Sequence, residues 1–187
     1  SYNCSRQIQR FLAEVQRFPS DTPVIVVNRL NAYLHGNNES QDGQPKTYVH
    51  TPYSSYSREI FQKEIIRGYE QAICQLSKSR PVYVLQPIPE MGKNVLNEEL
   101  KYSMILHQGL EVKISKLNHL QRSQLSMNIN SQLAQQCGVK LLNPLPYLCN
   151  DKQCFGSQNN VPYYFDDDHL NLRGARRLMP LFEPIVQ

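Results

Sequence analysis

Three short, mostly apolar runs rich in valine and leucine, far apart in the sequence, constrain the fold of this chain more than any other feature. They are residues 23–27, 81–85 and 139–142. A continuous apolar run of this length is typical of a strand buried on both faces, as in a parallel sheet covered by helices. The intervals and the C-terminus carry apolar residues at helical spacing, over residues 5–18, 57–78, 115–136 and 173–186. This alternation predicts an α/β fold, a three-layer αβα sandwich around a parallel sheet.

The bulk composition is that of one globular domain. The 187 residues fit a single domain over residues 1–187, long enough to bury its own core. The net charge is +4, but the basic residues are scattered and form no stripe, which argues against nucleic-acid binding. No apolar run reaches the length of a membrane span. The chain begins at Ser1 without an initiator methionine and enters a helical pattern at once, so we expect an N-terminally incomplete domain.

Two segments are candidates for ligand binding. In open α/β sheets, ligands bind beyond the carboxyl ends of the strands. The first apolar run ends in Asn28, Arg29 and Asn31, which are candidate site residues by position, although loop polarity alone would give a similar pattern. Residues 36–57 form a long polar segment that could carry substrate contacts. It contains three tyrosines that either stack on sugar rings or anchor the loop: Tyr48, Tyr53 and Tyr56.

The five cysteines indicate a disulfide more than a metal site. Cys149 and Cys154 close a short polar segment, and no second Cys or His pair has the spacing that would complete a zinc site. A disulfide between them is therefore favoured and would imply an oxidising compartment. Cys74 and Cys137 occupy apolar positions of helical segments, which predicts buried thiols. Cys4 is left over, either as a free thiol or with a partner outside this chain.

The densest group of chemically active side chains lies in residues 165–175. Asp166, Asp167 and Asp168 precede His169 at the start of the last helical segment. A carboxylate three residues before a histidine can accept the imidazole Nδ1–H, which leaves Nε2 to take a proton from a nucleophile. The alternative is that the run of aspartates only caps a helix.

In this order, the pieces resemble the SGNH-type extracytoplasmic domain that is fused to type 3 integral-membrane acyltransferases. The similarity covers most of the chain. It includes residues 26–33, residues 81–89, the Cys149–Cys154 pair and residues 164–175. The resemblance implies an SGNH-hydrolase-like, flavodoxin-like fold. The closing stretch is similar to the family's D-x-x-H block, which implies Asp166 as the orienting carboxylate and His169 as the general base of a Ser-His-Asp triad. Asp167 and Asp168 are runners-up that stand too close to the histidine.

One part of the family pattern is missing. No Gly-Asp-Ser-like element occurs, and Gly156-Ser157 follows the cysteine pair rather than a buried strand. In the family the nucleophilic serine lies upstream of everything seen here, so the resemblance implies that the first strand, the serine and a partner for Cys4 are absent from these residues. Arg29 matches the family's arginine at a strand end. The resemblance implies that Arg29, with Asn28 and Asn31 beside it, stabilises an oxyanion.

The resemblance implies an O-acyltransferase, first of all an O-acetyltransferase, that acts on hydroxyl groups of a cell-envelope polysaccharide. Lipopolysaccharide O-antigen, capsule and peptidoglycan all remain open as acceptors. The implied partners are this glycan and, as acyl donor, the membrane acyltransferase domain of the same full-length protein. That arrangement places the domain in the periplasm, tethered to the inner membrane, and requires no metal or cofactor. Two alternatives are a carbohydrate esterase that passes the acyl group to water and a non-catalytic glycan-binding module.

Overall fold

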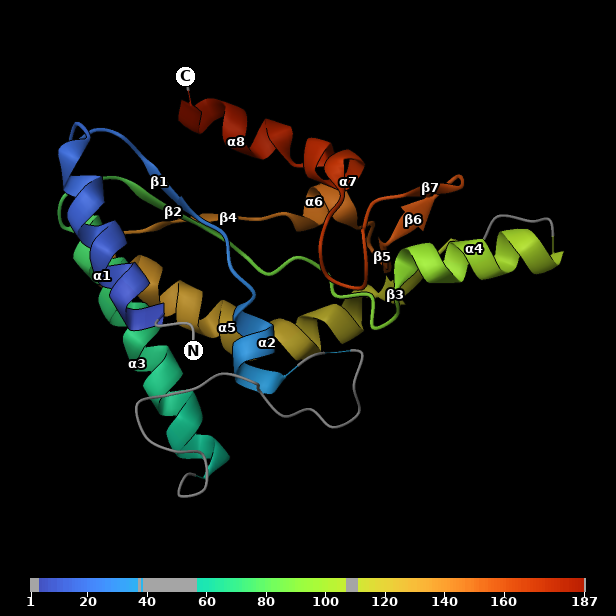
Figure 1. Ribbon diagram of the computed structural model, residues 1–187, viewed down its shortest axis with the longest axis horizontal. Helices are drawn as coiled ribbons and strands as arrows, with labels where there is room; N and C mark the ends of the chain where they lie inside the picture. Colours follow the sequence, from blue (N-terminus) through green and yellow to red (C-terminus); the bar gives the residue numbers. More distant parts are fainter. Residues whose placement is uncertain (1–3, 37, 39–56, 107–110, 187) are drawn as a thin grey trace. The chain divides into compact units, whose positions relative to one another are not determined.

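The computed structural model describes residues 4–36, 38, 57–106 and 111–186 (Figure 1). The three loop tyrosines with two open interpretations, Tyr48, Tyr53 and Tyr56, lie outside the described residues. The chain divides into two compact units. The first comprises Ser1–Asn28, Thr47–Leu85 and Asn128–Leu142, and the second comprises Arg29–Lys46, Gln86–Met127 and Asn143–Gln187.

The first unit is built on a parallel sheet, with strand order β1-β2-β4. Its strands are β1 (Val24–Val26), β2 (Val82–Leu85) and β4 (Lys140–Leu142). In the central strand β2, Val84 lies opposite Val26 on one side and Leu141 on the other. All three strands fall within the predicted apolar runs. The predicted α/β class with a parallel sheet is therefore confirmed.

The helices of the first unit lie close to the predicted ranges, except that the helix predicted over residues 5–18 ends at Glu14 and is followed by a 3₁₀ turn. They are α1 (Cys4–Glu14), the short 3₁₀ helix η1 (Val15–Arg17), α3 (Arg58–Ser77) and the last part of α5 (Lys116–Cys137). Ser57 caps α3, since its Oγ accepts the backbone N–H of Ile60 at 3.3 Å. Gly138 follows α5 with φ of +68°, the left-handed conformation that commonly ends a helix.

A disulfide joins Cys74 of α3 to Cys137 at the end of α5. The prediction of two buried thiols was wrong. Helical periodicity placed each cysteine on an apolar face but carried no information about which helices face each other. The two Cα atoms are 5.2 Å apart, within the range that a disulfide requires.

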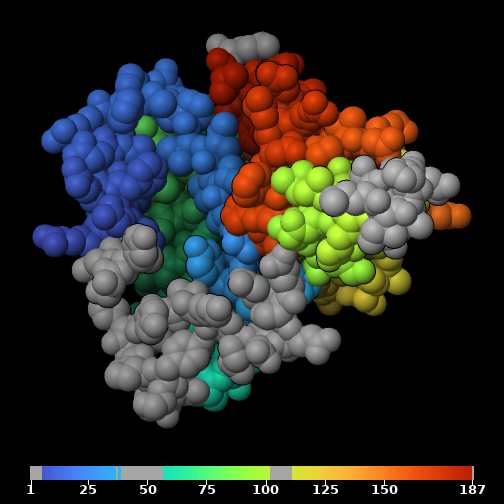
Figure 2. Space-filling model, turned by 45° about the vertical axis from the view of Figure 1, so that its right-hand side comes forward, coloured from blue at the N-terminus to red at the C-terminus, as the bar shows by residue number. Residues whose placement is uncertain are grey.

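The second unit has short strands, in two antiparallel pairs: β3 (Lys113–Ser115) with β5 (Gln153–Phe155), and β6 (Ser157–Gln158) with β7 (Val161–Pro162). Its helices are α2 (Leu30–His35), α4 (Val95–Leu106), the first part of α5, α6 (Leu145–Leu148), α7 (Leu172–Arg177) and α8 (Met179–Val186). Its core cluster consists of Met91, Val95, Val112, Cys154, Tyr163 and Tyr164. Figure 2 shows α4, in lime, against the orange segment that follows β5.

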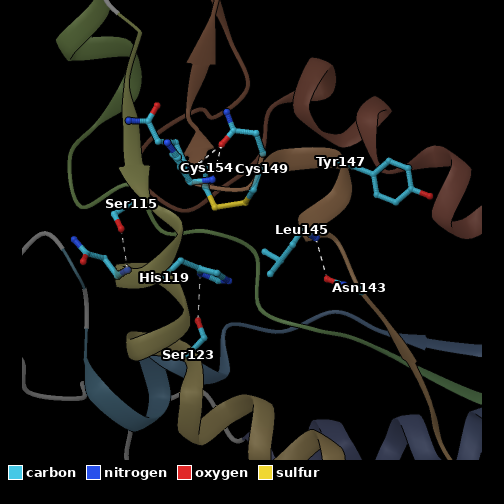
Figure 3. The surroundings of a disulfide bond; sticks show 12 residues. Ser115, His119, Ser123, Asn143, Leu145, Tyr147, Cys149 and Cys154 are labelled. Atoms are coloured by element: carbon cyan, nitrogen blue, oxygen red, sulfur yellow. Dashed lines mark hydrogen bonds between the residues drawn. A yellow bond between two sulfur atoms is a disulfide. The ribbon is translucent and has the colours of Figure 1, made fainter.

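The C-terminal helix differs from the prediction of one continuous helix over residues 173–186. The structure breaks it into α7 and α8 at Leu178. Pro180 accounts for the break, because proline lacks an N–H and its ring clashes with the carbonyl four residues earlier, whereas the first turn of a new helix accommodates it. A second disulfide joins Cys149 to Cys154, which closes the segment before β5 (Figure 3). Among the described residues, no helix is both long and apolar enough to cross a membrane.

Candidate functional site

The aspartate run forms a loop at the end of a short antiparallel pairing in the second unit. Tyr164 pairs with Leu170 in an antiparallel bridge. Beyond this pair, the N–H of Phe165 donates to the carbonyl oxygen of His169 at 2.7 Å, which closes the loop. Since Tyr164 is fully buried, the base of the loop is held in the core.

The backbone of the loop is also bound to the start of α4. The N–H of Met91 donates to the carbonyl oxygen of Asp167 at 2.7 Å, and that of Val95 donates to Asp166 at 3.1 Å. Val95 begins α4, so its N–H has no acceptor within the helix. Met91 and Val95 both belong to the buried core, and the loop is therefore fixed to a rigid support.

Asp166 holds His169 through both carboxylate oxygens. Its Oδ1 accepts the backbone N–H groups of Asp168, at 3.0 Å, and of His169, at 2.7 Å. Its Oδ2 lies 2.7 Å from Nδ1 of His169. With Nδ1 as the donor, the neutral imidazole carries its free lone pair on Nε2. The His169 side chain is 55% exposed, so this geometry suits a base that takes protons from a bound molecule.

A second carboxylate lies at the same nitrogen. Oδ1 of Asp168 is 2.9 Å from Nδ1 of His169, but it makes no hydrogen bond within the described part of the chain. Oδ2 of Asp168 forms an ion pair with Arg29. The Asp168 side chain is only 4% exposed, whereas that of Arg29 is 40% exposed. The guanidinium therefore compensates the charge of a buried carboxylate next to the imidazole.

The side chain of Asp167 is buried, as is that of Asp168. Burial raises the pKa of the Asp167 carboxyl group, and the negative charges of Asp166 and Glu90 raise it further. Glu90 forms an ion pair with Arg122 at 2.5 Å, and Arg122 also donates to the carbonyl oxygen of Gly36 at 2.7 Å. Sequence reasoning missed this ion pair, because the two residues lie in different parts of the chain and match no motif.

Asn31 is part of a buried polar network with α5. Its Nδ2 donates to Oγ of Ser123 at 2.9 Å, and its Oδ1 accepts from Oγ of Ser126 at 2.6 Å. Ser123 in turn lies 3.3 Å from Nδ1 of His119 (Figure 3). Burial lowers the pKa of His119 to about 4, so this imidazole is neutral at ordinary pH. The predicted site residue Asn31 thus lies inside the second unit, with both ends of its amide engaged.

Asn28 belongs to the first unit. Its Nδ2 donates to the hydroxyl of Tyr69 at 3.0 Å, and Tyr69 donates to Oδ1 of Asn130 at 3.1 Å. Burial raises the pKa of Tyr69 to about 12. Of the three polar residues predicted at the first strand end, Arg29 is the one that the structure brings to Asp168 and His169.

Asn171, rather than an aspartate, caps the helix that follows the loop. Its Oδ1 accepts the N–H groups of Arg173 and Gly174 at 2.9 and 3.0 Å, and its Nδ2 donates to the carbonyl oxygen of Pro162 at 2.9 Å. Gly174 is buried so closely that a Cβ atom there would lie 2.1 Å from the carbonyl oxygen of Tyr163. These contacts fasten α7 to the strand that carries the loop.

The site has the donor types of a metal site as well. The ligand atoms of Asp166, Asp168 and His169 lie within 4.8 Å of one another. The ion pair with Arg29 disfavours a cation there, because the guanidinium already neutralises Asp168 and would repel it. The Asp166–Nδ1 contact also occupies the nitrogen that faces the carboxylates.

The family described as "SGNH domain (fused to AT3 domains)" matches residues 1–184 of the sequence. The chain belongs to this family. No curated protein matches it. Among solved structures, the SGNH domain is similar to the periplasmic domain of a lipopolysaccharide acetyltransferase from Salmonella ser. Paratyphi A, with a TM-score of 0.61 and 15% sequence identity.

This likeness extends over 96% of the SGNH domain but only 62% of the Salmonella chain. At this identity, the likeness bears on the fold. It supports the α/β architecture with a parallel sheet that the apolar runs predict. The expected resemblance to SGNH domains of membrane acyltransferases is confirmed by the family match.

Proposed function

We propose that this chain is the SGNH domain of an O-acyltransferase that passes an acyl group, first of all acetyl, to hydroxyl groups of a cell-envelope polysaccharide. The observation that carries the proposal is the contact of Asp166 Oδ2 with Nδ1 of the exposed His169 at 2.7 Å, within an SGNH domain. The fusion of this family to AT3 domains supports a membrane acyltransferase domain as the donor of the acyl group. The Salmonella neighbour, a periplasmic domain of a lipopolysaccharide acetyltransferase, supports a lipopolysaccharide as the acceptor and the periplasm as the location.

In the first half-reaction, Nε2 of His169 takes the proton of a serine hydroxyl, and the serine oxygen attacks the acyl carbon of the donor. None of the serines in this chain lies in a Gly-Asp-Ser-like motif, and we assign this role to none of them. Asp166 stabilises the imidazolium that forms, since its carboxylate accepts the Nδ1–H. His169 then gives the proton to the departing donor group, which leaves an acyl-serine.

In the second half-reaction, a sugar hydroxyl approaches the acyl-serine. His169 takes the hydroxyl proton while the sugar oxygen attacks the acyl carbon, and it returns the proton to the serine oxygen as the new ester separates. The structure contains one candidate serine by sequence pattern, Ser157, but its side chain is fully buried and its Oγ accepts the N–H of Val112 at 2.9 Å. We therefore do not assign Ser157 as the nucleophile.

Arg29 is the donor that we propose for the oxyanion. Its guanidinium has five N–H groups, and only the Nη2 group pairs with Asp168. Because the Arg29 side chain is 40% exposed, its other end is available to donate to an oxyanion. For Asn28 and Asn31 we propose supporting roles, since their amides are bound to Tyr69 and to the serines of α5.

The test uses the purified full-length protein with p-nitrophenyl acetate as acyl donor, with and without the polysaccharide of the source organism. The proposal predicts that glycan accelerates p-nitrophenol release and that mass spectrometry finds acetyl esters on the sugar. Release of free acetate alone, unaffected by glycan, would support the esterase. Absence of turnover in both conditions would support the binding module.

A further inference from the structure

Phe165 is an exposed aromatic residue at the entrance of the loop that carries Asp166 and His169. Its side chain is 67% exposed, more than any other phenylalanine among the exposed apolar residues of the described chain. Tyr164, the preceding residue, is fully buried. The two exposures place Tyr164 on the buried face and Phe165 on the solvent face of this segment.

The register of the strand pair places Phe165 next to His169. Tyr164 pairs with Leu170, and the N–H of Phe165 donates to the carbonyl oxygen of His169 at 2.7 Å. Phe165 and His169 are therefore opposite each other across the pair. Opposite residues of antiparallel strands direct their side chains to the same face, with Cβ atoms about 5 Å apart. The register therefore directs the side chains of Phe165 and His169 to the same exposed face of the pair.

We propose that Phe165 is the platform on which a pyranose ring of the acceptor stacks while one of its hydroxyl groups meets Nε2 of His169. The inference rests on the proposed function and adds the residue that selects the acceptor. One face of a pyranose presents C–H bonds of slightly positive charge, and the face of an aromatic ring is negative, so the two attract.

The first test measures kinetics in the full-length enzyme, with p-nitrophenyl acetate as donor and methyl α-D-glucopyranoside, methyl α-D-galactopyranoside or methyl α-L-rhamnopyranoside as acceptor. Phe165→Ala raises the acceptor KM about tenfold for the best of these sugars. The increase in acceptor KM exceeds any change in the acceptor-free release of p-nitrophenol, and Phe165→Trp retains the wild-type acceptor KM. An unchanged acceptor KM in Phe165→Ala would overturn the inference, as would an equal loss of the acceptor-free reaction.

The second test measures binding without catalysis. The sequence contains no tryptophan, so Phe165→Trp introduces a single fluorescent reporter into the chain. The three glycosides shift its emission saturably, whereas glycerol, which has hydroxyl groups but no ring, does not. The matched control is Val186→Trp, at a position that is 71% exposed on α8 and is predicted to respond to none of them. Equal responses of the two reporters, or none at residue 165, contradict the inference. If wild-type protein lacks p-nitrophenyl acetate turnover, the proposed function fails, and this titration still decides the stacking.

Discussion

Arg29 and Asp168, which are 139 positions apart in the sequence, form an ion pair in which the carboxylate is buried beside Nδ1 of His169. Asp166 reaches the same nitrogen from the exposed side and makes the hydrogen bond. The two carboxylates therefore differ in role. Asp166 orients and stabilises the charged imidazole, and Asp168 ties the loop to the residue that begins the second unit.

This difference predicts a split between two asparagine variants of the full-length enzyme. Asp166→Asn lowers kcat/KM for p-nitrophenyl acetate by about a hundredfold or more, because the amide no longer stabilises the imidazolium. Asp168→Asn lowers kcat/KM less. It also reduces the free energy of unfolding by about 1–2 kcal/mol, a value discounted for the exposure of Arg29. Urea denaturation and ester turnover check both variants. Equal loss of activity without loss of stability in the two variants would refute the assignment.

The close packing of Gly174 predicts a strongly destabilised alanine variant. The added Cβ would meet the carbonyl oxygen of Tyr163 at 2.1 Å, and the backbone must shift to relieve the clash. We expect Gly174→Ala to cost about 3 kcal/mol of unfolding free energy. Gly68 in α3 is the matched control, since a Cβ there meets nothing within 4 Å. Gly68→Ala should stabilise the protein by about 1 kcal/mol through helix propensity, and thermal denaturation distinguishes the two outcomes.

The two disulfides should contribute unequally to stability. Cys74–Cys137 spans a sequence separation of 63, whereas Cys149–Cys154 spans only 5. In the loop-closure model, removing the long-range bond by a double serine variant costs about 4 kcal/mol, and removing the short-range bond costs about 2 kcal/mol. Denaturant unfolding under oxidising conditions measures both. A larger loss of unfolding free energy in the variant that lacks Cys149–Cys154 would contradict this prediction. It would show that local strand geometry, rather than chain entropy, determines how much each disulfide stabilises the protein.

The burial of His119 should reduce the free energy of unfolding in acid. Burial lowers its pKa from 6.5 to about 4 in the folded protein, so the unfolded chain takes up a proton first as pH falls. The stability is fully present above pH 6.5 and declines by about 1 kcal/mol per pH unit until the folded pKa is reached. Comparing urea unfolding at successive pH values for wild type and His119→Gln isolates this contribution. Identical pH slopes in the two proteins would contradict it.

Features set by local sequence were predictable. The strands followed from runs such as Val24–Val26, whose β-branched residues suit a sheet buried on both faces. The contact between Asp166 and His169 followed from a spacing of three residues, since a loop of that length brings the two side chains together. The resemblance to the SGNH family predicted how these elements combine into one fold.

Features that depend on distant contacts were not predictable. Sequence periodicity placed Cys74 and Cys137 on apolar faces, but only the packing of α3 against α5 makes them a disulfide. Asp168 stands next to His169 in the sequence, and nothing local indicates that Arg29 pairs with it. The capping role of Asn171 had a visible signal, an asparagine just before a helical segment, but the adjacent aspartates competed with it.

The most direct test of the account is the variant His169→Ala in the full-length protein, assayed for acetyl esters on the glycan by mass spectrometry. Leu172→Ala, at a position that is 66% exposed three residues further along, is the control. With both variants folded by circular dichroism, we predict that His169→Ala lowers acylation by about a thousandfold or more, while Leu172→Ala stays close to wild type. Glycan acylation at the wild-type rate in folded His169→Ala would contradict the role of this histidine as the base.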